Sequence, residues 1–503
     1  MIPTRPAIGA LSGVLLVVAL PKPDLYFVGW LALVPLFLVL DGHGNWKQTF
    51  LVGYAAGVAF FGGTCYWIVS TMYTYGGLSL PLAVAVFGLF VAVFAVHTSL
   101  FLLLMRRYLG RWGDRGLWLA APSWVAVELV QAHTIFGGFP WMLAGYALAP
   151  FGGLLQMAAW TGVYGLSFVL VSVNALFALG IRTRDWRPGA AGLAVVVLAV
   201  LLPSPADPAP GEEDGSLRVR IVQTNIPIDY PWGGIEEEQL LDELSVLALG
   251  GGGNPELVVW PETPGPFLLS RDAPFAVRMS ALARRLDAHV LVGYIDFRGE
   301  MPTNSAGLVS PAGEQVSRYD KIHLVPFGEY VPFGDVLFFA ESLVRNVGDF
   351  APGTEHTIST VGEHRIAATI CYEDVFPALM RQFTRRGAEA IVNITNDGWF
   401  GSTSAPYQHL RMAEVRAVEN RRYVIRAANT GISAIIDPYG NVVSGTRLGE
   451  RTLLDGVARY RSDLTPYVRF GDIFAFAAAF VAVAFLLVAW RSAGGDSMKG
   501  SVR

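Results

Sequence analysis

HRIAATICYED (364–374) is a run of β-branched and apolar residues that ends in a cysteine, a tyrosine and two acids. Such a run is typical of a buried strand whose polar residues emerge at its carboxyl end. The intervals 235–248, 272–287 and 404–421 have helical spacing and charged faces. Strands and helices therefore alternate, which predicts a layered α/β domain. Comparable strand-like runs are LRVRIVQTNI (217–226), ELVVWPE (256–262), HVLVGYID (289–296), AEAIVNITND (388–397) and YVIRAANTGISAIIDP (423–438).

Three reactive side chains stand at or near the ends of such segments. Glu262 closes the run ELVVWPE, Cys371 closes ATIC, and Lys321 lies in RYDKIHLVPFGEYVPF (318–333). Open α/β sheets collect their ligands at strand carboxyl ends, so we expect these groups to meet. A partly desolvated carboxylate can act as a general base, a fixed ammonium can stabilise an oxyanion, and a thiol can act as the nucleophile.

Each of these residues also has a simpler interpretation. Glu262 is then a turn acid, Lys321 a surface lysine and Cys371 an inert buried thiol. Glu329, in the lysine segment, either orients its neighbours or satisfies a turn. The other cysteine, Cys65, lies within a predicted membrane span, so the two thiols are not expected to pair.

The composition predicts a membrane protein. Of 503 residues, 53% are hydrophobic and only 16% are charged, whereas soluble domains are about 25% charged. A bilayer-spanning helix needs about 20 apolar residues. Seven candidate spans precede a Pro-, Gly- and acid-rich linker (203–216), and an eighth follows the α/β region. They lie near 7–20, 24–40, 50–70, 80–104, 117–131, 158–181, 188–203 and 472–490.

Loop charges predict the orientation. With a cytoplasmic N-terminus, every inner segment carries arginine or lysine, whereas the short outer loops carry only Lys22. Residues 204–471 would then lie outside and both termini inside. The first span has a cleaved signal peptide as its alternative interpretation. Glu128, in the fifth span, is expected either near the interface or facing the bundle interior.

The net charge and the absence of known motifs limit the kinds of partner that the sequence indicates. The net charge of −4 is small, so no nucleic-acid partner is indicated. No zinc spacing, P-loop or G-x-G-x-x-G motif occurs, so the sequence implies no metal and no cofactor.

Two outer loops, 71–79 and 132–157, contain no Lys, Arg, Asp or Glu and are rich in glycine and aromatic residues. They are either an aromatic belt at the membrane interface or a surface on which a lipid rests. The segment 332–344 is either a membrane-facing lid or a core helix.

Together these motifs resemble the nitrilase (carbon–nitrogen hydrolase) superfamily. The likeness rests on the WPE, YDKxHLVPFGEYVP and CYE segments and continues through 393–440. It implies an α-β-β-α sandwich and a Glu-Lys-Cys triad, with Glu262 as the base, Lys321 as the oxyanion cation and Cys371 as the nucleophile. It further implies supporting or substrate-binding roles for Glu329, Tyr372, Glu373, Trp232 and Glu419.

The spans narrow this likeness to the membrane-embedded acyl-transferring branch of the superfamily. We therefore expect a multi-pass α-helical membrane bundle of about eight spans (1–203 and 472–503, the latter with a cytoplasmic tail) and a periplasmic nitrilase-like α/β domain (204–471) in the bacterial inner membrane. The implied partners are a phospholipid acyl donor, a diacylglyceryl apolipoprotein acceptor and the lipid bilayer. The alternative function is a membrane-anchored amidase that uses the same triad. A transporter is disfavoured, because it would need several buried ionisable residues in its spans and Glu128 is nearly alone there.

Overall fold

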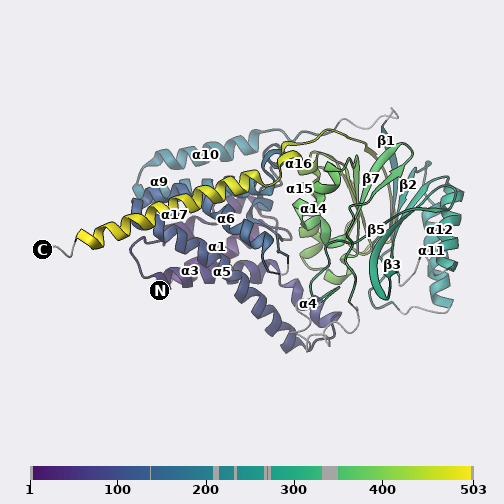
Figure 1. Ribbon diagram of the computed structural model, residues 1–503, viewed down its shortest axis with the longest axis horizontal. Coiled ribbons are helices and arrows are strands. Elements are labelled where there is room, and N and C mark those ends of the chain that lie inside the picture. Colours follow the sequence, from purple (N-terminus) through teal and green to yellow (C-terminus); the bar gives the residue numbers. More distant parts are fainter. Residues whose placement is uncertain are drawn as a thin grey trace. The chain divides into compact units, whose positions relative to one another are not determined.

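The computed structural model describes residues 4–135, 137–207, 215–230, 235–265, 269, 273–330 and 349–499. The chain divides into two compact units, drawn in Figure 1. The first unit comprises Met1–Val69, Leu80–Ser204 and Phe470–Arg503, and the second comprises Ser70–Ser79 and Pro205–Arg469. The second unit therefore includes the end of α4 (Trp67–Thr74) and the loop that follows it.

The first unit is helical. Two of its helices begin at a capping side chain: Asn45 accepts the backbone N–H of Lys47 at the start of α3, and Asp185 accepts that of Arg187 at the start of α10. The helices are α1 (Arg5–Ala19), α2 (Val34–Leu38), α3 (Trp46–Thr64), α4 (Trp67–Thr74), α5 (Leu80–Trp112), α6 (Ala120–His133), α7 (Gly152–Leu155), α8 (Ala158–Thr161), α9 (Val163–Thr183), α10 (Trp186–Leu201) and α17 (Ile473–Lys499), with 3-10 turns η1 (Tyr26–Trp30), η2 (Gly113–Leu119) and η3 (Ala144–Leu148).

Three helical stretches in the described chain are long and apolar enough to cross a membrane. They are Leu80–His133, Val163–Thr183 and Ile473–Arg491, and the bent pair Trp46–Thr64 and Trp67–Thr74 makes a fourth if it counts as one span. Arg5–Ala19, Tyr26–Leu38 and Trp186–Leu201 are apolar but shorter. The predicted region 24–40 is broken between η1 and α2 rather than forming one long helix. The eight spans therefore remain a prediction, although the membrane character of the unit agrees with it.

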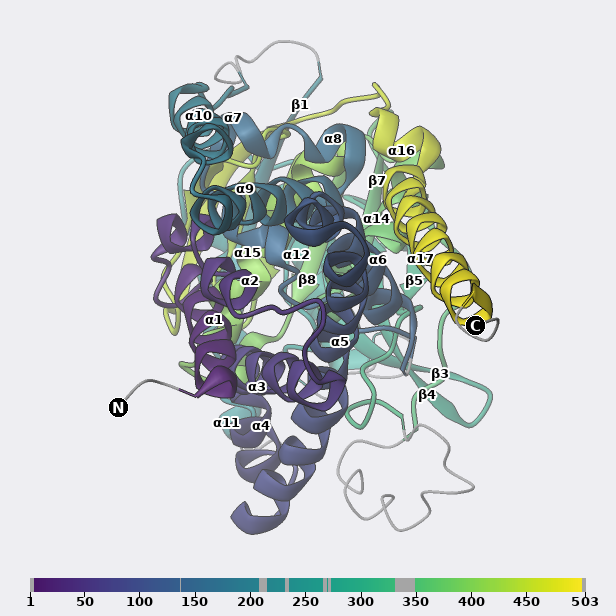
Figure 2. The ribbon, with the colours of Figure 1, turned by 90° about the vertical axis from the view of Figure 1, so that its left-hand side faces the viewer.

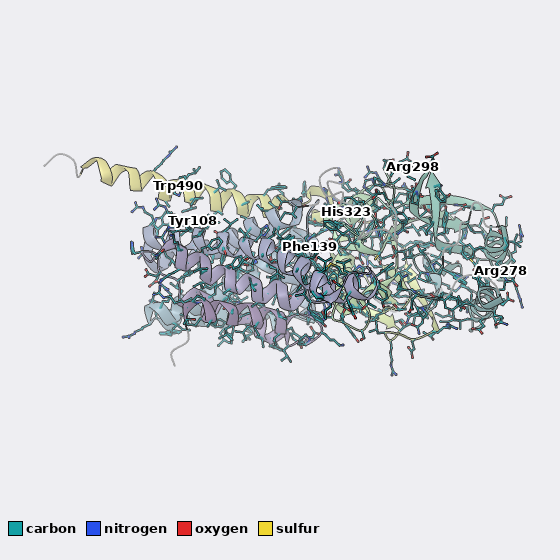
Figure 3. All side chains as sticks on the ribbon, turned by 90° about the horizontal axis from the view of Figure 1, so that it is seen from below. Tyr108, Phe139, Arg278, Arg298, His323 and Trp490 are labelled. Atoms are coloured by element: carbon teal, nitrogen blue, oxygen red, sulfur yellow. The ribbon has the colours of Figure 1, made fainter. Side chains whose placement is uncertain are left out.

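The outer surface of the helical unit is apolar. Figure 2 shows α17 running beside α6, and the Tyr108 hydroxyl donates to the backbone oxygen of Ala482 on α17 at 2.7 Å. Trp490, near the end of the same helix, is 64% exposed and is labelled with Tyr108 in Figure 3. Large apolar side chains exposed along a helix are what a lipid-facing surface requires.

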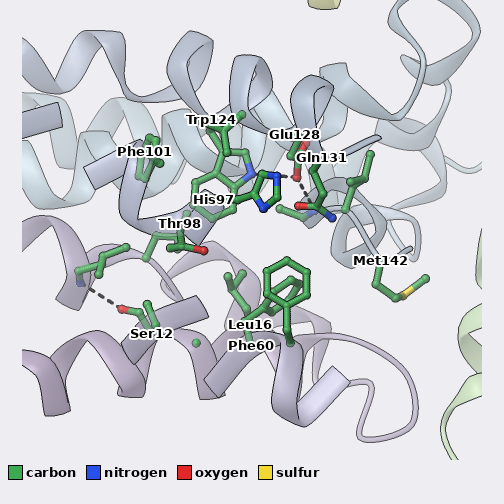
Figure 4. Close-up of a pocket in the computed structure, with 18 residues that line it drawn as sticks. Ser12, Leu16, Phe60, His97, Thr98, Phe101, Trp124, Glu128, Gln131 and Met142 are labelled. Atoms are coloured by element: carbon green, nitrogen blue, oxygen red, sulfur yellow. Dashed lines mark hydrogen bonds between the residues drawn. The ribbon is translucent and has the colours of Figure 1, made fainter. Parts of the chain in front are cut away.

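Glu128 faces the bundle interior. It is buried, and its Oε1 accepts the indole N–H of Trp124 and the backbone N–H of Ala144, both at 2.8 Å. It lines a cavity of about 30 Å³ together with His97 and Gln131 (Figure 4). The bond to Ala144 ties the end of α6 to the chain that returns through η3, so the interior alternative predicted for this acid is the observed one.

The second unit contains two six-stranded sheets in the described part of the chain. The first sheet has the order β12-β1-β2-β3-β4-β5 and the second has the order β11-β10-β9-β8-β7-β6. In the first, β1, β2 and β3 are parallel; in the second, β7, β8 and β9 are parallel. The strands are β1 (Ser216–Gln223), β2 (Leu257–Val259), β3 (His289–Arg298), β4 (Met301–Val309), β5 (Gln315–Asp320), β6 (Ile358–Val361), β7 (His364–Ile370), β8 (Ala390–Thr395), β9 (Val424–Ala428), β10 (Ala434–Ile436), β11 (Val442–Gly445) and β12 (Thr452–Arg459).

Helices cover the outer face of each sheet, as Figure 1 shows. Helices α11 (Ile235–Leu249) and α12 (Ala273–Leu286) flank the first sheet, while α14 (Pro377–Arg385) and α15 (Ala405–Asn420) flank the second; α16 (Pro466–Phe470) ends the unit. Every residue of β8 and β9 is buried, because these central strands are covered on both faces. The predicted α/β domain with two sheets is confirmed.

Candidate active site

Glu262, Lys321 and Glu329 form one buried charge cluster. Glu262 follows β2, and Lys321 follows β5. The Lys321 Nζ donates to Oε1 of Glu329 at 2.9 Å and to Oε1 of Glu262 at 3.3 Å. All three side chains are buried, and Lys321 is only 1% exposed. Burial alone would lower the pKa of Lys321, but the two carboxylates outweigh it and raise that pKa, so the lysine stays charged.

Asn304 completes this cluster, and sequence reasoning missed it. Its Nδ2 donates to Oε1 of Glu262 and to Oε1 of Glu329, both at 2.8 Å. The backbone N–H of Lys321 donates to the backbone oxygen of Asn304 at 2.8 Å, so β4 also positions the lysine. Asn304 stands between two other buried polar residues of β4, Thr303 and Ser305, so no local pattern distinguishes it.

Glu262 retains one free acceptor position in the described chain. A carboxylate has about four lone-pair sites. Asn304 and Lys321 occupy two sites on Oε1, and the backbone N–H of Asn396 occupies one on Oε2 at 2.9 Å. The remaining site, on Oε2, is available to accept a proton from a neighbouring group.

Cys371 begins the turn η5 (Cys371–Val375), directly after β7. Its φ is +49°, a left-handed conformation that costs a non-glycine residue about 1–2 kcal/mol. The thiol is buried, and burial raises its pKa well above the usual value; Glu262 raises that pKa further, whereas Lys321 lowers it. These mutual effects show that the thiol lies within electrostatic reach of both residues. Since little thiolate forms by itself, the thiol needs a base to react.

Glu373 joins the cysteine turn to the lysine segment. Its Oε1 accepts the Tyr319 hydroxyl and the backbone N–H of Ile322, both at 2.7 Å, and its Oε2 accepts the backbone N–H of Ile370 at 2.8 Å. Burial is the largest effect on this acid and raises its pKa to about 7, although these donors act in the opposite direction. Glu373 is therefore a brace between two loops.

Tyr372 packs among aromatic rings. Its ring lies edge-on to the Phe376 ring, with the centroids 5.0 Å apart, and the His323 ring lies tilted against Phe376, with the centroids 3.6 Å apart. Burial and then the nearby Lys321 lower the pKa of His323 to about 4, so this imidazole is neutral at pH 7. The cysteine turn is thus flanked by an apolar wall.

Glu419, Trp232 and the segment 332–344 are the remaining predicted positions. Glu419 forms an ion pair with Arg416 on the same helix at 3.2 Å, and both are fully buried. Trp232 and the segment 332–344 lie outside the described residues. Within the described ranges, no group of three or more histidine, cysteine and acidic side chains could hold a metal ion.

Comparisons with known proteins identify related families. Residues 218–459 match the carbon–nitrogen hydrolase family, and residues 12–176 match the apolipoprotein N-acyltransferase N-terminal domain. The apolipoprotein N-acyltransferase of Geobacter metallireducens is 38% identical over 96% of this chain and 94% of its own. That of Brucella melitensis is 33% identical over 88% of each chain. Among solved structures, an amidase from Nesterenkonia sp. is 20% identical with a TM-score of 0.38, covering 53% of this chain and 97% of its own.

The second unit is a carbon–nitrogen hydrolase domain, by its family match and its two sheets. The identity to the two curated relatives extends through both units. The chain belongs to the apolipoprotein N-acyltransferase family, a family of membrane-bound enzymes.

Proposed function

We propose that this chain transfers a fatty acyl group from the sn-1 position of a phospholipid, phosphatidylethanolamine in the first instance, to the N-terminal amine of diacylglyceryl-cysteine in apolipoproteins. The observation that carries the proposal is the buried cluster in which Lys321 is shared by two carboxylates beside a left-handed Cys371. The names of the curated relatives support the substrate class.

The first half-reaction forms a thioester. Glu262 takes the thiol proton of Cys371 through its free acceptor position, and the thiolate attacks the ester carbonyl. Lys321 and the backbone N–H of Tyr372 stabilise the oxyanion. The bond to the glycerol oxygen then breaks, Glu262 returns its proton to that oxygen, and the lysophospholipid departs. The acyl group remains on sulfur.

The second half-reaction forms an amide. The neutral α-amine of the acceptor attacks the thioester carbonyl, and Glu262 removes a proton from the attacking nitrogen. The tetrahedral intermediate again places its oxyanion at Lys321. Collapse releases the Cys371 thiolate, which recovers the proton held by Glu262. Atoms and charges balance over the cycle, and no cofactor is required.

The proposed setting is the bacterial inner membrane. Both substrates are anchored by acyl chains, and removing a chain from lipid costs about 0.8 kcal/mol per CH₂. A membrane unit made of 1–203 and 472–503 would keep those chains in the bilayer while a periplasmic domain (204–471) performs the chemistry. The arginine-rich inner segments support cytoplasmic termini.

Intact-mass spectrometry tests the reaction. The purified chain is incubated with phosphatidylethanolamine labelled in its sn-1 chain, and a diacylglyceryl lipopeptide is then added. We expect one acyl mass on Cys371 that disappears as the acylated peptide forms. Cys371→Ala should carry no acyl group, while Cys65→Ala, the matched control, should behave like the parent. Turnover retained by Cys371→Ala would remove Cys371 as the nucleophile. Ammonia release from a small amide without transfer to amines would favour the amidase alternative.

Limited proteolysis tests the orientation. Protease added to the periplasmic side should cleave within 204–471 and leave 105–116 intact. The opposite pattern would overturn the proposed topology.

A further inference from the structure

Four ionisable side chains form a fully buried cluster next to the Cys371 turn. Asp374 belongs to η5 itself, Asp397 begins the turn η6 (Asp397–Phe400) after β8, His409 lies on α15 and Arg426 on β9. None of the four is more than 1% exposed. The reaction proposed above uses none of them, so their burial needs a separate reason.

Each of the two acids in the cluster contacts both His409 and Arg426. The His409 ring lies between the two acids, with Nε2 2.6 Å from Asp374 Oδ1 and Nδ1 2.9 Å from Asp397 Oδ1. Arg426 donates to the other oxygen of each acid, at 3.1 Å to Asp374 and 2.8 Å to Asp397. With His409 protonated, two cations balance two anions.

The geometry favours the protonated imidazole. Each ring nitrogen of His409 faces a carboxylate oxygen, which can only accept. Burial and Arg426 lower the pKa of His409, but the two acids outweigh them and raise it. Arg426 Nη2 also lies 2.8 Å from His409 Nδ1. When the imidazole is protonated, His409 Nδ1 and Arg426 Nη2 both donate to Asp397. The two nitrogens are therefore close because they share this acceptor, and they do not hydrogen-bond to each other.

The cluster reaches the nucleophile through Asn393. Arg426 Nη1 donates to Oδ1 of Asn393 at 3.0 Å, and Nδ2 of Asn393 donates to the backbone oxygen of Cys371 at 3.3 Å. Asp374 acts from the other side, because it stands three residues after Cys371 in the same turn. The cations therefore hold both ends of the turn whose first residue is left-handed.

We propose that His409 and Arg426 are positioning residues, which hold the Cys371 turn in its left-handed conformation and offset the negative charge of Asp374 and Asp397 beside the thiol. The positioning itself is independent of the substrate, and only its effect on acyl transfer rests on the proposed function. Without one cation, a single guanidinium must balance two buried acids. Their excess negative charge would then oppose formation of the thiolate.

Thiol alkylation measures this effect without any substrate. Full-length protein carrying Cys65→Ala leaves Cys371 as the only thiol, and its reaction with iodoacetamide is followed from pH 6 to pH 10. In His409→Gln we expect the pH profile to move upward by about one unit, so that the rate at pH 7.5 falls about tenfold. Arg220→Gln, which breaks the buried ion pair with Asp455 in the other sheet, is the matched control and should leave the profile in place.

A second variant tests the proposal in case the loss of a buried charge in His409→Gln disturbs folding. Asn393→Ser removes the link to the Cys371 backbone without removing a buried charge. It should slow acyl-enzyme formation with labelled phospholipid about tenfold and leave the KM for lipid unchanged. Unchanged alkylation profiles in His409→Gln, together with unchanged acylation in Asn393→Ser, would overturn the proposal. A parent protein that forms no acyl-enzyme while His409→Gln still shifts the alkylation profile would refute the proposed function and retain the positioning role.

Discussion

The ammonium nitrogen of Lys321 lies 2.9 Å from Oε1 of Glu329. It lies farther, 3.3 Å, from Oε1 of Glu262. Glu329 is thus the nearer counter-ion, so the lysine can face an oxyanion without requiring the base to supply its only negative partner. Glu262 then keeps its free acceptor position for the thiol.

Replacing Glu329 by glutamine should lower kcat while leaving the KM for phospholipid nearly unchanged. The glutamine keeps an oxygen for the backbone N–H of Val325 but no longer offsets the charge of Lys321, which would then move toward Glu262. We expect a loss of about 10- to 100-fold in acyl-enzyme formation. Glu314→Gln, at an exposed acid before β5, is the control and should have no effect. An equal loss in both variants would contradict the assigned role.

Replacing Lys321 by methionine should reduce acylation by about 10²–10³, the usual effect of losing one oxyanion donor. It also removes the cation between two acids and, with it, a nearby positive charge that lowers the pKa of the Cys371 thiol. The parent and variant rates are compared by quenched-flow mass measurement of the acyl-enzyme. A rate within threefold of the parent would exclude Lys321 from oxyanion stabilisation.

Replacing Glu373 by glutamine should destabilise the second unit by about 1–3 kcal/mol, because a buried NH₂ group would face donors that require an acceptor. Tyr319→Phe, which removes only one of those donors, should cost less. Chemical unfolding of the detergent-solubilised protein, followed by tryptophan fluorescence, checks the order. Equal stability of Glu373→Gln and the parent would contradict the bracing role.

Gly293 permits the approach of Glu262. A Cβ at this position would lie 2.7 Å from the Glu262 Cα and 2.7 Å from the Pro261 oxygen. Gly293→Ala should therefore displace the base and lower acylation at least tenfold. Gly252→Ala, where a Cβ meets nothing within 4 Å, should leave activity intact. Full activity in Gly293→Ala would show that the backbone at 261–263 shifts without consequence.

The stability of the buried ionic cluster should depend on pH. The folded-state pKa of His409 lies above its usual value of 6.5, so its contribution is complete below about pH 6.5 and is lost as the pH rises through the folded value. Thermal unfolding midpoints should fall from pH 6 to pH 9 more steeply in the parent than in His409→Gln. Parallel curves would mean that His409 is neutral in the folded protein.

Much of the fold could be predicted from residue pattern. The runs at 217–226, 289–296 and 388–397 overlap β1, β3 and β8, and the helical intervals overlap α11, α12 and α15. The strands β4 to β6 and β11 to β12 were missed because their apolar and polar residues do not form long β-branched runs. The tandem of short helices between 26 and 38 was missed because hydropathy alone does not reveal where an apolar helix breaks.

The sequence predicted the reactive residues of the site but not the buried residues that hydrogen-bond to them directly or through another side chain. Glu262, Lys321 and Cys371 stand out because their side chains are reactive and end a segment. Asn304 and Arg426 lie inside strands, and their importance depends on which distant residues they meet. Such partners arise from tertiary contacts that no local pattern encodes. The role predicted for Glu419 shows the converse, since its ion-pair partner is Arg416 on its own helix.

The segment Ser70–Ser79 lies far from the rest of its unit in sequence, yet its Thr71 hydroxyl donates to the backbone oxygen of Trp399 at 2.8 Å and its Tyr75 ring meets the Trp399 ring edge-on at 5.6 Å. Trp399 follows Asp397 by two residues in η6. A fragment cut at Pro205 would therefore lose a piece of its own packing, and chimaeras that exchange catalytic halves between relatives would need to carry this ten-residue segment along. A single crossover near residue 205 would separate Ser70–Ser79 from the Trp399 that it contacts, so such an exchange would be disfavoured.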